Sequence, residues 1–277
     1  MKEFKSFCKT VGGNEGSKCK YPTRLDLYGC GCQHDCKYCY AKSLLSFRNL
    51  WNAQAPAVAD INKVERAIKK MPKGTILRLG GMTDCFQPCE LEYRNTYKAI
   101  ELLNKYGIGY LIVTKSHLVA NDEYMALYDK DLCHIQVTFT STTAEVSRSI
   151  EKASLPAQRI EAIEKLHKAG FDVAIRLSPY IPQFVDIDII NKIQCDKILV
   201  EFLRINTWIK KWLNINFDEF TVKSGGYLHL PLEKKKALLS LIKKEHISVC
   251  EDVTEHFDYW REYVNENKSD CCNLRKA

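Results

Sequence analysis

The chain has 277 residues, of which 45% are apolar and 27% charged, with a formal net charge of +7. This composition is globular, and the length allows one large domain or two small ones. No stretch approaches the roughly eighteen uncharged apolar residues of a membrane span, and residues 1–9 lack the apolar run of a secretion signal. We therefore expect a soluble, cytoplasmic protein whose thirteen cysteines are free thiols rather than disulfides.

The basic residues are interspersed with 34 acidic ones, and the densest basic run, residues 234–236, falls in a predicted helix that begins after Pro231. A solvated helix face explains this run best. Nucleic acid stays an alternative partner that the charge does not favour, and no membrane partner is expected.

Residues 1–24 are predicted to form an N-terminal extension that carries Cys8 and Cys19. Strand and helix patterns then alternate, and Gly107 and Gly170 each follow a helix at the usual stop position. The predicted strands are 25–28, 75–79, 108–114, 134–140, 171–177 and 197–202, and the predicted helices are 42–52, 60–70, 91–106, 121–129, 156–169 and 186–193.

Six strand–helix repeats indicate parallel strands joined by right-handed crossovers. Because a complete barrel of this kind has eight units, the predicted fold is α/β, a partial (β/α)6 TIM-like barrel over residues 25–205. Functional groups are expected at the carboxyl ends of its strands. Residues 206–277 form a C-terminal extension, with a helix at 232–245 and a candidate seventh strand at 247–249.

Three cysteines follow the first predicted strand with the spacing C-x3-C-x2-C: Cys32, Cys36 and Cys39. One compact loop can wrap three thiolates round a metal centre and leave one coordination position open. Soft thiolate ligands favour iron–sulfur clusters or zinc over hard cations. The alternative is a zinc site with His34 or Cys30 as fourth ligand, which would make the chain a zinc-stabilised binding module without catalysis.

This triplet, with Tyr38 just before its last cysteine and with its place after the first strand, resembles the radical S-adenosylmethionine (radical SAM) superfamily. The resemblance implies a 4Fe-4S cluster whose open iron is chelated by S-adenosylmethionine (SAM). It also implies reductive cleavage of SAM to a 5′-deoxyadenosyl radical, which abstracts hydrogen from a substrate that the sequence does not identify. An electron donor such as flavodoxin or ferredoxin is implied as a partner.

Three further stretches resemble the spore photoproduct lyase-like branch of that superfamily: residues 80–90, with the pattern TD-x-x-Q-P-x-E, residues 114–116, and residues 176–179. The likeness covers roughly residues 25–205. Glycine at two of these positions would allow close approach of the backbone to the methionine moiety, and polar side chains would bond its carboxylate or the ribose. The implied cofactor-binding residues are Tyr38, Gly80, Gly81, Thr83, Lys115, Ser141, Arg176 and Ser178.

One departure from that branch concerns the thiol that returns hydrogen to the product radical. The resemblance implies a cysteine shortly before Asp84, but residues 80–82 are Gly, Gly and Met. Cys85 is the candidate substitute as a catalytic hydrogen donor. The family likeness and the basic balance make nucleic-acid lesion repair or modification an alternative function, which this departure does not favour.

The remaining cysteines suggest a second metal site. Cys250, Cys271 and Cys272 lie towards the C-terminus, and adjacent cysteines in a polar tail are prone to oxidation unless they are ligated or buried. We expect these three thiols to bind a second iron–sulfur cluster together with one further cysteine, for which the candidates are Cys8, Cys19, Cys30, Cys85 and Cys89. Cys133 and Cys195 lie beside apolar strand residues and are predicted to be inert core thiols.

Overall fold

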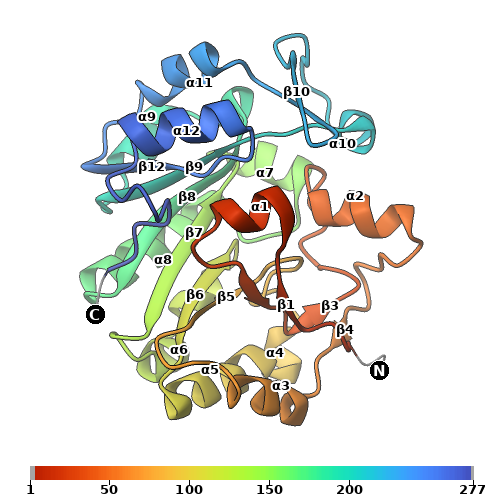
Figure 1. The fold of residues 1–277 in the computed structure, drawn as a ribbon, viewed down its shortest axis with the longest axis vertical. Helices are drawn as coiled ribbons and strands as arrows, with labels where there is room; N and C mark the ends of the chain where they lie inside the picture. Colours follow the sequence, from red (N-terminus) through yellow and green to blue (C-terminus); the bar gives the residue numbers. More distant parts are fainter. Residues whose placement is uncertain (1–3, 276–277) are drawn as a thin grey trace.

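The computed structural model describes residues 4–275, and its centre is an eight-stranded sheet (Figure 1). Residues 1–3 of the expected N-terminal extension and residues 276–277 of the C-terminal one lie outside the described part. In spatial order the strands are β1 (Cys8–Thr10), β2 (Thr23–Leu25), β5 (Ile76–Leu79), β6 (Gly109–Thr114), β7 (Cys133–Phe139), β8 (Asp172–Tyr180), β9 (Lys197–Phe202) and β12 (His246–Val249).

Only the pairing of β1 with β2 is antiparallel in this sheet, and the other neighbours run parallel. This arrangement confirms the predicted partial barrel of parallel strands. The candidate seventh strand is confirmed as well, because β12 pairs with β9 over its whole length. Each extension thus contributes a strand to the sheet, β1 from the first and β12 from the second.

The first strand differs from the prediction of 25–28, because the chain leaves the sheet after Leu25. The Asp26 carboxylate there accepts hydrogen bonds from the amides of Gly81 and Met82, both at 2.8 Å. The following residues form a short separate strand, β3 (Tyr28–Gly29), which pairs with β4 (Ala57–Val58). A local pattern of apolar residues does not reveal this change of partner.

Helices connect the strands of the sheet (Figure 1). They are α1 (Gly13–Lys18), α2 (Tyr40–Phe47), α3 (Ile61–Ile68), α4 (Glu90–Tyr93), α5 (Asn95–Tyr106), α6 (Asp122–Leu127), α7 (Ala144–Ile150), α8 (Pro156–Lys168), α9 (Ile187–Lys192), α10 (Thr207–Trp212), α11 (Leu232–Leu239) and α12 (Thr254–Tyr263). A hairpin of β10 (Val222–Ser224) and β11 (Tyr227–His229) follows α10. No helix among residues 4–275 is long and apolar enough to cross a membrane.

Glycine ends α5 as predicted, since Gly107 has a φ of +63° and an L-residue there would be strained. The predicted helix 91–106 is instead two helices, which meet at Arg94 with a φ of +52°. The Glu90 carboxylate accepts the free amides of Thr96 and Tyr97 at the start of α5, at 2.8 and 3.0 Å. This contact supplies the N-terminal cap of α5 and explains the break.

The core lies between the sheet and its helices. All seven residues of β7 are buried, as expected for a central parallel strand that is covered on both faces. Cys133 and Cys195 are 0% and 3% exposed, which confirms them as core thiols.

Candidate metal and cofactor site

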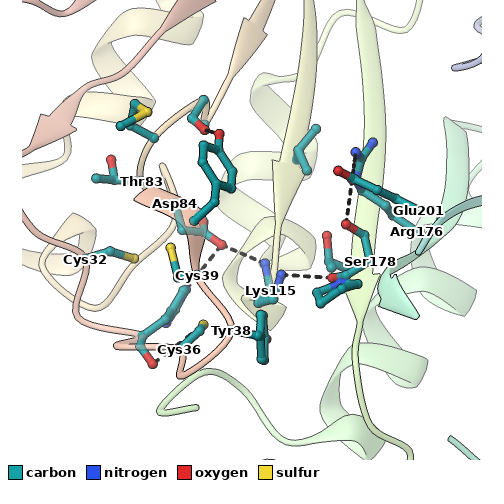
Figure 2. Close-up of a pocket in the computed structure, with 18 of the residues that line it drawn as sticks. Cys32, Cys36, Tyr38, Cys39, Thr83, Asp84, Lys115, Arg176, Ser178 and Glu201 are labelled. Atoms are coloured by element: carbon teal, nitrogen blue, oxygen red, sulfur yellow. Dashed lines mark hydrogen bonds and ion pairs between the residues drawn. The ribbon is translucent and has the colours of Figure 1, made fainter. Parts of the chain in front are cut away.

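Three thiols of one loop face a cavity of about 180 Å³ at the carboxyl ends of the parallel strands. The loop connects β3 to α2, and the Asp35 amide, which donates to Cys32 O at 3.0 Å, closes a tight turn within it. The Cys39 sulfur caps α2 by accepting from the Lys42 amide at 3.4 Å. Figure 2 shows the sulfurs of Cys32, Cys36 and Cys39 on one side of the pocket.

Burial raises the pKa of all three thiols. Negative charge raises it further, from Asp84 at Cys32 and from Glu151 at Cys36. A bound metal ion would stabilise the deprotonated thiolates in this position. The donor set fits a soft metal centre, since it offers sulfur ligands from a single short loop.

A buried ion pair supports the loop from behind. Glu151 and Arg159 have fully buried side chains and contact each other directly. Glu151 also accepts the hydroxyl hydrogen of Tyr38 and lies 3.8 Å from the Cys36 sulfur. The Lys37 amide donates to Ile150 O at 2.8 Å, so the loop rests on the end of α7. Sequence reasoning named neither Glu151 nor Arg159, because nothing local distinguishes them from surface charges.

Asp84 ties the loop to the end of β6. Its carboxylate accepts from the Thr114 hydroxyl and the Lys115 amide, both at 2.7 Å, and lies 3.3 Å from His34 Nε2. Burial alone would raise the pKa of Asp84, but His34, the Lys115 amide and the Thr114 hydroxyl lower it to about 2. Asp84 is thus an ionised positioning group under the cysteine loop.

The other polar residues of the TD-x-x-Q-P-x-E stretch also hold the chain in place. Gln87 accepts the Gln33 amide hydrogen at 2.9 Å, and Glu90 accepts the Tyr124 hydroxyl hydrogen at 2.6 Å. The first contact connects the cysteine loop to the segment after β5, and the second connects that segment to α6. Asp84, Gln87 and Glu90 each accept a hydrogen bond from a different neighbouring segment. Three polar side chains so close together in the sequence are a signal that could have indicated this positioning role.

Glycine is required twice in the turn after β5. Gly80 has a φ of +84°, and a Cβ there would lie 2.9 Å from Val113 O. A Cβ at Gly81 would lie 2.4 Å from the Arg24 side chain. The turn places the amides of Gly81 and Met82 on Asp26, whose pKa is raised by burial.

The wall opposite the cysteines carries Arg176, Ser178 and Glu201 (Figure 2). Glu201 accepts from Arg176 Nη2 at 2.5 Å and from the Ser178 hydroxyl at 2.8 Å. Burial would raise the pKa of Glu201, but Arg176 and Arg204 lower it to about 2. Arg176 and Ser178 therefore already hold a carboxylate that the sequence analysis did not name.

The cavity wall brings together most of the residues predicted at this site: Cys32, Cys36, Cys39, Tyr38, Gly80, Gly81, Thr83, Lys115, Arg176 and Ser178. The Thr83 hydroxyl donates to Tyr28 O at 2.6 Å, and Lys115 Nζ donates to Ser178 O at 3.4 Å. Ser141 lies outside this lining and is 0% exposed. Cys85 also lies outside it, buried in the core, and burial raises its pKa well above the usual value.

The remaining thiols separate clearly. Cys19, Cys250, Cys271 and Cys272 line a second cavity of about 70 Å³. Cys8, Cys30, Cys85 and Cys89 line neither cavity. Of the five candidates for a fourth thiol beside the C-terminal three, the structure thus brings Cys19 to them.

Taken together, the parallel partial barrel and the three thiols that face a cavity at its strand ends are typical of barrel proteins that hold a metal centre through thiolates. The family model of the radical SAM superfamily matches residues 27–193. The match spans more than half of the chain, and the protein belongs to this superfamily.

Among curated proteins, the chain is similar to the uncharacterized protein MJ0683 of Methanocaldococcus jannaschii, with 28% identity over 68% of this chain and 74% of that protein. It is also 28% identical to the uncharacterized protein ORF301 of Acidianus two-tailed virus, over 56% of this chain and 55% of the viral protein.

Among solved structures, the chain is similar to spore photoproduct lyase. One such structure, with bound AdoMet and dinucleoside spore photoproduct, has a TM-score of 0.60 at 15% identity and covers 93% of this chain and 78% of the lyase. A second, complexed with the dinucleoside spore photoproduct, has a TM-score of 0.61 at 15% identity over 92% and 77% of the two chains. This likeness is one of fold.

Proposed function

We propose that the protein is an active radical SAM enzyme, in which Cys32, Cys36 and Cys39 bind a 4Fe-4S cluster and SAM binds beside it in the larger cavity. When bound and reduced, this pair supplies a 5′-deoxyadenosyl radical, which takes a hydrogen atom from the substrate. The observation that carries the proposal is the convergence of three thiols from one loop, two of them buried and one half-buried, on a cavity of about 180 Å³.

Several polar groups on the cavity wall suit the parts of SAM. Lys115 Nζ lies on this wall, where burial lowers its pKa, and a bound carboxylate would favour its charged form. Trp51 Nε1 is buried and has no hydrogen-bond partner among the described residues. A bound ligand with an acceptor oxygen or nitrogen would satisfy this donor.

The surrounding residues hold the site rigid before any ligand arrives. Asp84 fixes the loop from the β6 side, and Glu151 fixes it from the α7 side. The Tyr40 hydroxyl donates to Gly81 O at 2.6 Å, which joins α2 to the glycine turn. Such fixed groups keep a reactive centre aligned with its substrate.

We extend the proposal to the compartment and the redox partner, but not to photoproduct repair. A reducing cytoplasm suits a chain with thirteen cysteines, and flavodoxin or ferredoxin would supply the electron. Repair with a cysteine hydrogen donor would need a further thiol on the cavity wall. Among the described residues that line this cavity, the thiols are those of Cys32, Cys36 and Cys39.

SAM cleavage under anaerobic conditions tests this function. Protein reconstituted with iron and sulfide and reduced with dithionite should release 5′-deoxyadenosine, measured by chromatography and mass spectrometry. Cys36→Ala should reduce the product to the level without enzyme, whereas Cys8→Ala, a half-buried thiol outside the cavity, should retain it. A protein that holds about four irons in the loop site and forms no 5′-deoxyadenosine would contradict the proposal.

A further inference from the structure

The second cavity collects four thiols from three distant parts of the chain. Cys19 follows α1, Cys250 follows β12, and Cys271 and Cys272 belong to the tail after α12. All four cysteines are free and half-buried. Electrostatic interactions link the thiol of Cys271 to those of Cys250 and Cys272, and the thiol of Cys19 to the same two.

Hydrogen bonds hold these three segments against one another. The Tyr21 hydroxyl donates to Asp270 Oδ2 at 2.6 Å, which joins the segment after Cys19 to the tail. Lys18 Nζ donates to Asp252 O at 2.7 Å, which joins α1 to the segment after β12. The Cys250 amide donates to Val200 O at 2.9 Å and continues the pairing of β12 with β9. Tertiary hydrogen bonds therefore fix the segments that carry the four thiols.

One arginine beside this cavity lacks a carboxylate partner. Four arginines, Arg24, Arg78, Arg176 and Arg204, line both cavities together with Glu15 and Glu201 and form the arginine wall between them. Three of these arginines have carboxylate partners, in Glu15, Glu201 and Asp252. Arg78 has no ion-pair partner among the described residues, and its buried Nε has no hydrogen-bond partner there either. A thiolate-bound iron–sulfur cluster carries the net negative charge that would complement this wall.

The spacing of the sulfurs favours a cluster over a single ion. Four thiolates round one zinc ion lie within about 4 Å of one another, because each Zn–S bond is about 2.3 Å long. Among the described residues, three donor atoms come within 4.8 Å of one another only at His229, Glu251 and Asp252. Two of those donors are already neutralised, Glu251 by Lys235 and Asp252 by Arg204. No three sulfurs of the second cavity lie within 4.8 Å of one another in the part of the chain that the structure describes. These thiols are therefore spread more widely than a single zinc ion requires.

We propose that Cys19, Cys250, Cys271 and Cys272 bind a second iron–sulfur cluster, of the 4Fe-4S type, on the far side of the arginine wall from the first. Four protein thiolates would occupy all four irons. This centre would therefore leave no iron open for SAM, in contrast to a centre held by Cys32, Cys36 and Cys39. The proposal goes beyond the proposed function and does not depend on cleavage of SAM.

Metal and sulfide analysis of the reconstituted full-length chain tests the second centre without any activity assay. The wild type should hold about eight irons and about eight sulfides per chain, and the variant Cys19→Ser/Cys271→Ser about four of each. A variant with alanine at Cys32, Cys36 and Cys39 should also retain about four of each, with the electron paramagnetic resonance (EPR) signal of a reduced 4Fe-4S cluster. Cys8→Ser is the matched control and should keep the wild-type content, because Cys8 is a half-buried thiol outside both cavities.

Three outcomes would overturn the proposal. They are a Cys19→Ser/Cys271→Ser variant that keeps the wild-type iron and sulfide content, a folded triple-alanine variant without iron and sulfide, and stoichiometric zinc without sulfide at the second thiols. Circular dichroism establishes whether each variant is folded, and Mössbauer spectra of the wild type count the two kinds of cluster if a variant unfolds. Failure of the proposed function looks different, because it removes the release of 5′-deoxyadenosine while the triple-alanine variant still holds about four irons and four sulfides.

Discussion

The two thiol sets lie on opposite sides of one wall of arginines, yet the chain builds them in different ways. Cys32, Cys36 and Cys39 come from a single loop, so their spacing alone brings them together. Cys19, Cys250, Cys271 and Cys272 meet only when the segment before β2, the end of β12 and the tail have all folded. A local motif is therefore robust to changes elsewhere, whereas the second set depends on contacts that join the two ends of the chain.

The residues that hold the two thiol sets in place also differ: one support lies within the barrel and the other holds the C-terminal tail. The first loop rests on the buried pair of Glu151 and Arg159, within the barrel itself. The tail of the second set is anchored by Asp172, which accepts the Arg275 amide hydrogen at 2.8 Å. Substitutions at Glu151 and at Asp172 should therefore affect the first and the second thiol set separately.

The largest expected effect is that of Glu151→Ala. It leaves the fully buried Arg159 without its carboxylate, and removing one partner of such a pair costs about 3–5 kcal/mol. Urea denaturation of the metal-free protein should show this loss in the free energy of unfolding. Glu219→Ala is the control, since its exposed pair with Lys234 contributes about 1 kcal/mol at most. Equal losses in the two variants would show that the loop does not depend on the buried pair.

Asp172→Asn should have the next largest effect and should act on the tail. The Asp172 carboxylate accepts from His134 Nδ1 and Lys197 Nζ, both at 2.6 Å, and Lys197 Nζ also donates to Asn273 O at 3.1 Å. Loss of these charged hydrogen bonds should lower the free energy of unfolding by about 2 kcal/mol at neutral pH. Limited proteolysis should then cleave the tail faster than in the wild type, while an unchanged rate would contradict the anchoring role.

The same substitution makes stability less sensitive to acid. Burial would raise the pKa of Asp172, but His134, Lys197 and the Arg275 amide lower it below the ordinary value of 3.8. A carboxyl whose pKa is lower in the folded state stabilises the fold above that ordinary value, and this contribution is lost as the pH falls below it. The free energy of unfolding of the wild type should therefore fall more steeply below about pH 4 than that of Asp172→Asn. Asp122→Asn, at an exposed position, should follow the wild type, and parallel curves for all three proteins would contradict the prediction.

The smallest effect is expected at the glycine turn beside the first set. Gly80→Ala adds a Cβ at a φ of +84°, 2.9 Å from Val113 O. Gly74→Ala meets a similar φ of +78° but has no atom within 4 Å of the added Cβ, so it isolates the backbone strain of about 1–2 kcal/mol. Thermal unfolding should show a greater loss for Gly80→Ala than for Gly74→Ala. Equal losses of thermal stability in the two variants would mean that the backbone near Val113 shifts to accommodate the added Cβ.

Local patterns in the sequence predict much of the fold but few of the side-chain hydrogen bonds that join its segments. Alternating apolar segments, with a stop at Gly107, indicate the parallel sheet, and C-x3-C-x2-C indicates the first thiol set. The departure of the chain from the sheet at Asp26 and the break at Arg94 were not predicted, because each depends on a carboxylate that binds amides of another segment.

The residues that line the two cavities were likewise predicted only where their position depends on local sequence. The sequence predicts three C-terminal thiols in the second set but leaves five candidates for the fourth, since the choice depends on tertiary contacts such as that of Tyr21 with Asp270. Ser141 and Cys85 follow the ends of strands, as the other predicted residues do, yet the local backbone buries both outside the cavity.

One measurement separates the two thiol sets most directly: the EPR spectrum of dithionite-reduced protein with and without SAM. The wild type should show two signals, of which only one changes when SAM is added. Cys19→Ser/Cys271→Ser should keep the SAM-sensitive signal, and alanine at Cys32, Cys36 and Cys39 should leave only the SAM-insensitive one. A SAM-sensitive signal that survives loss of Cys32, Cys36 and Cys39, or that disappears with Cys19 and Cys271, would contradict this division of the thiols.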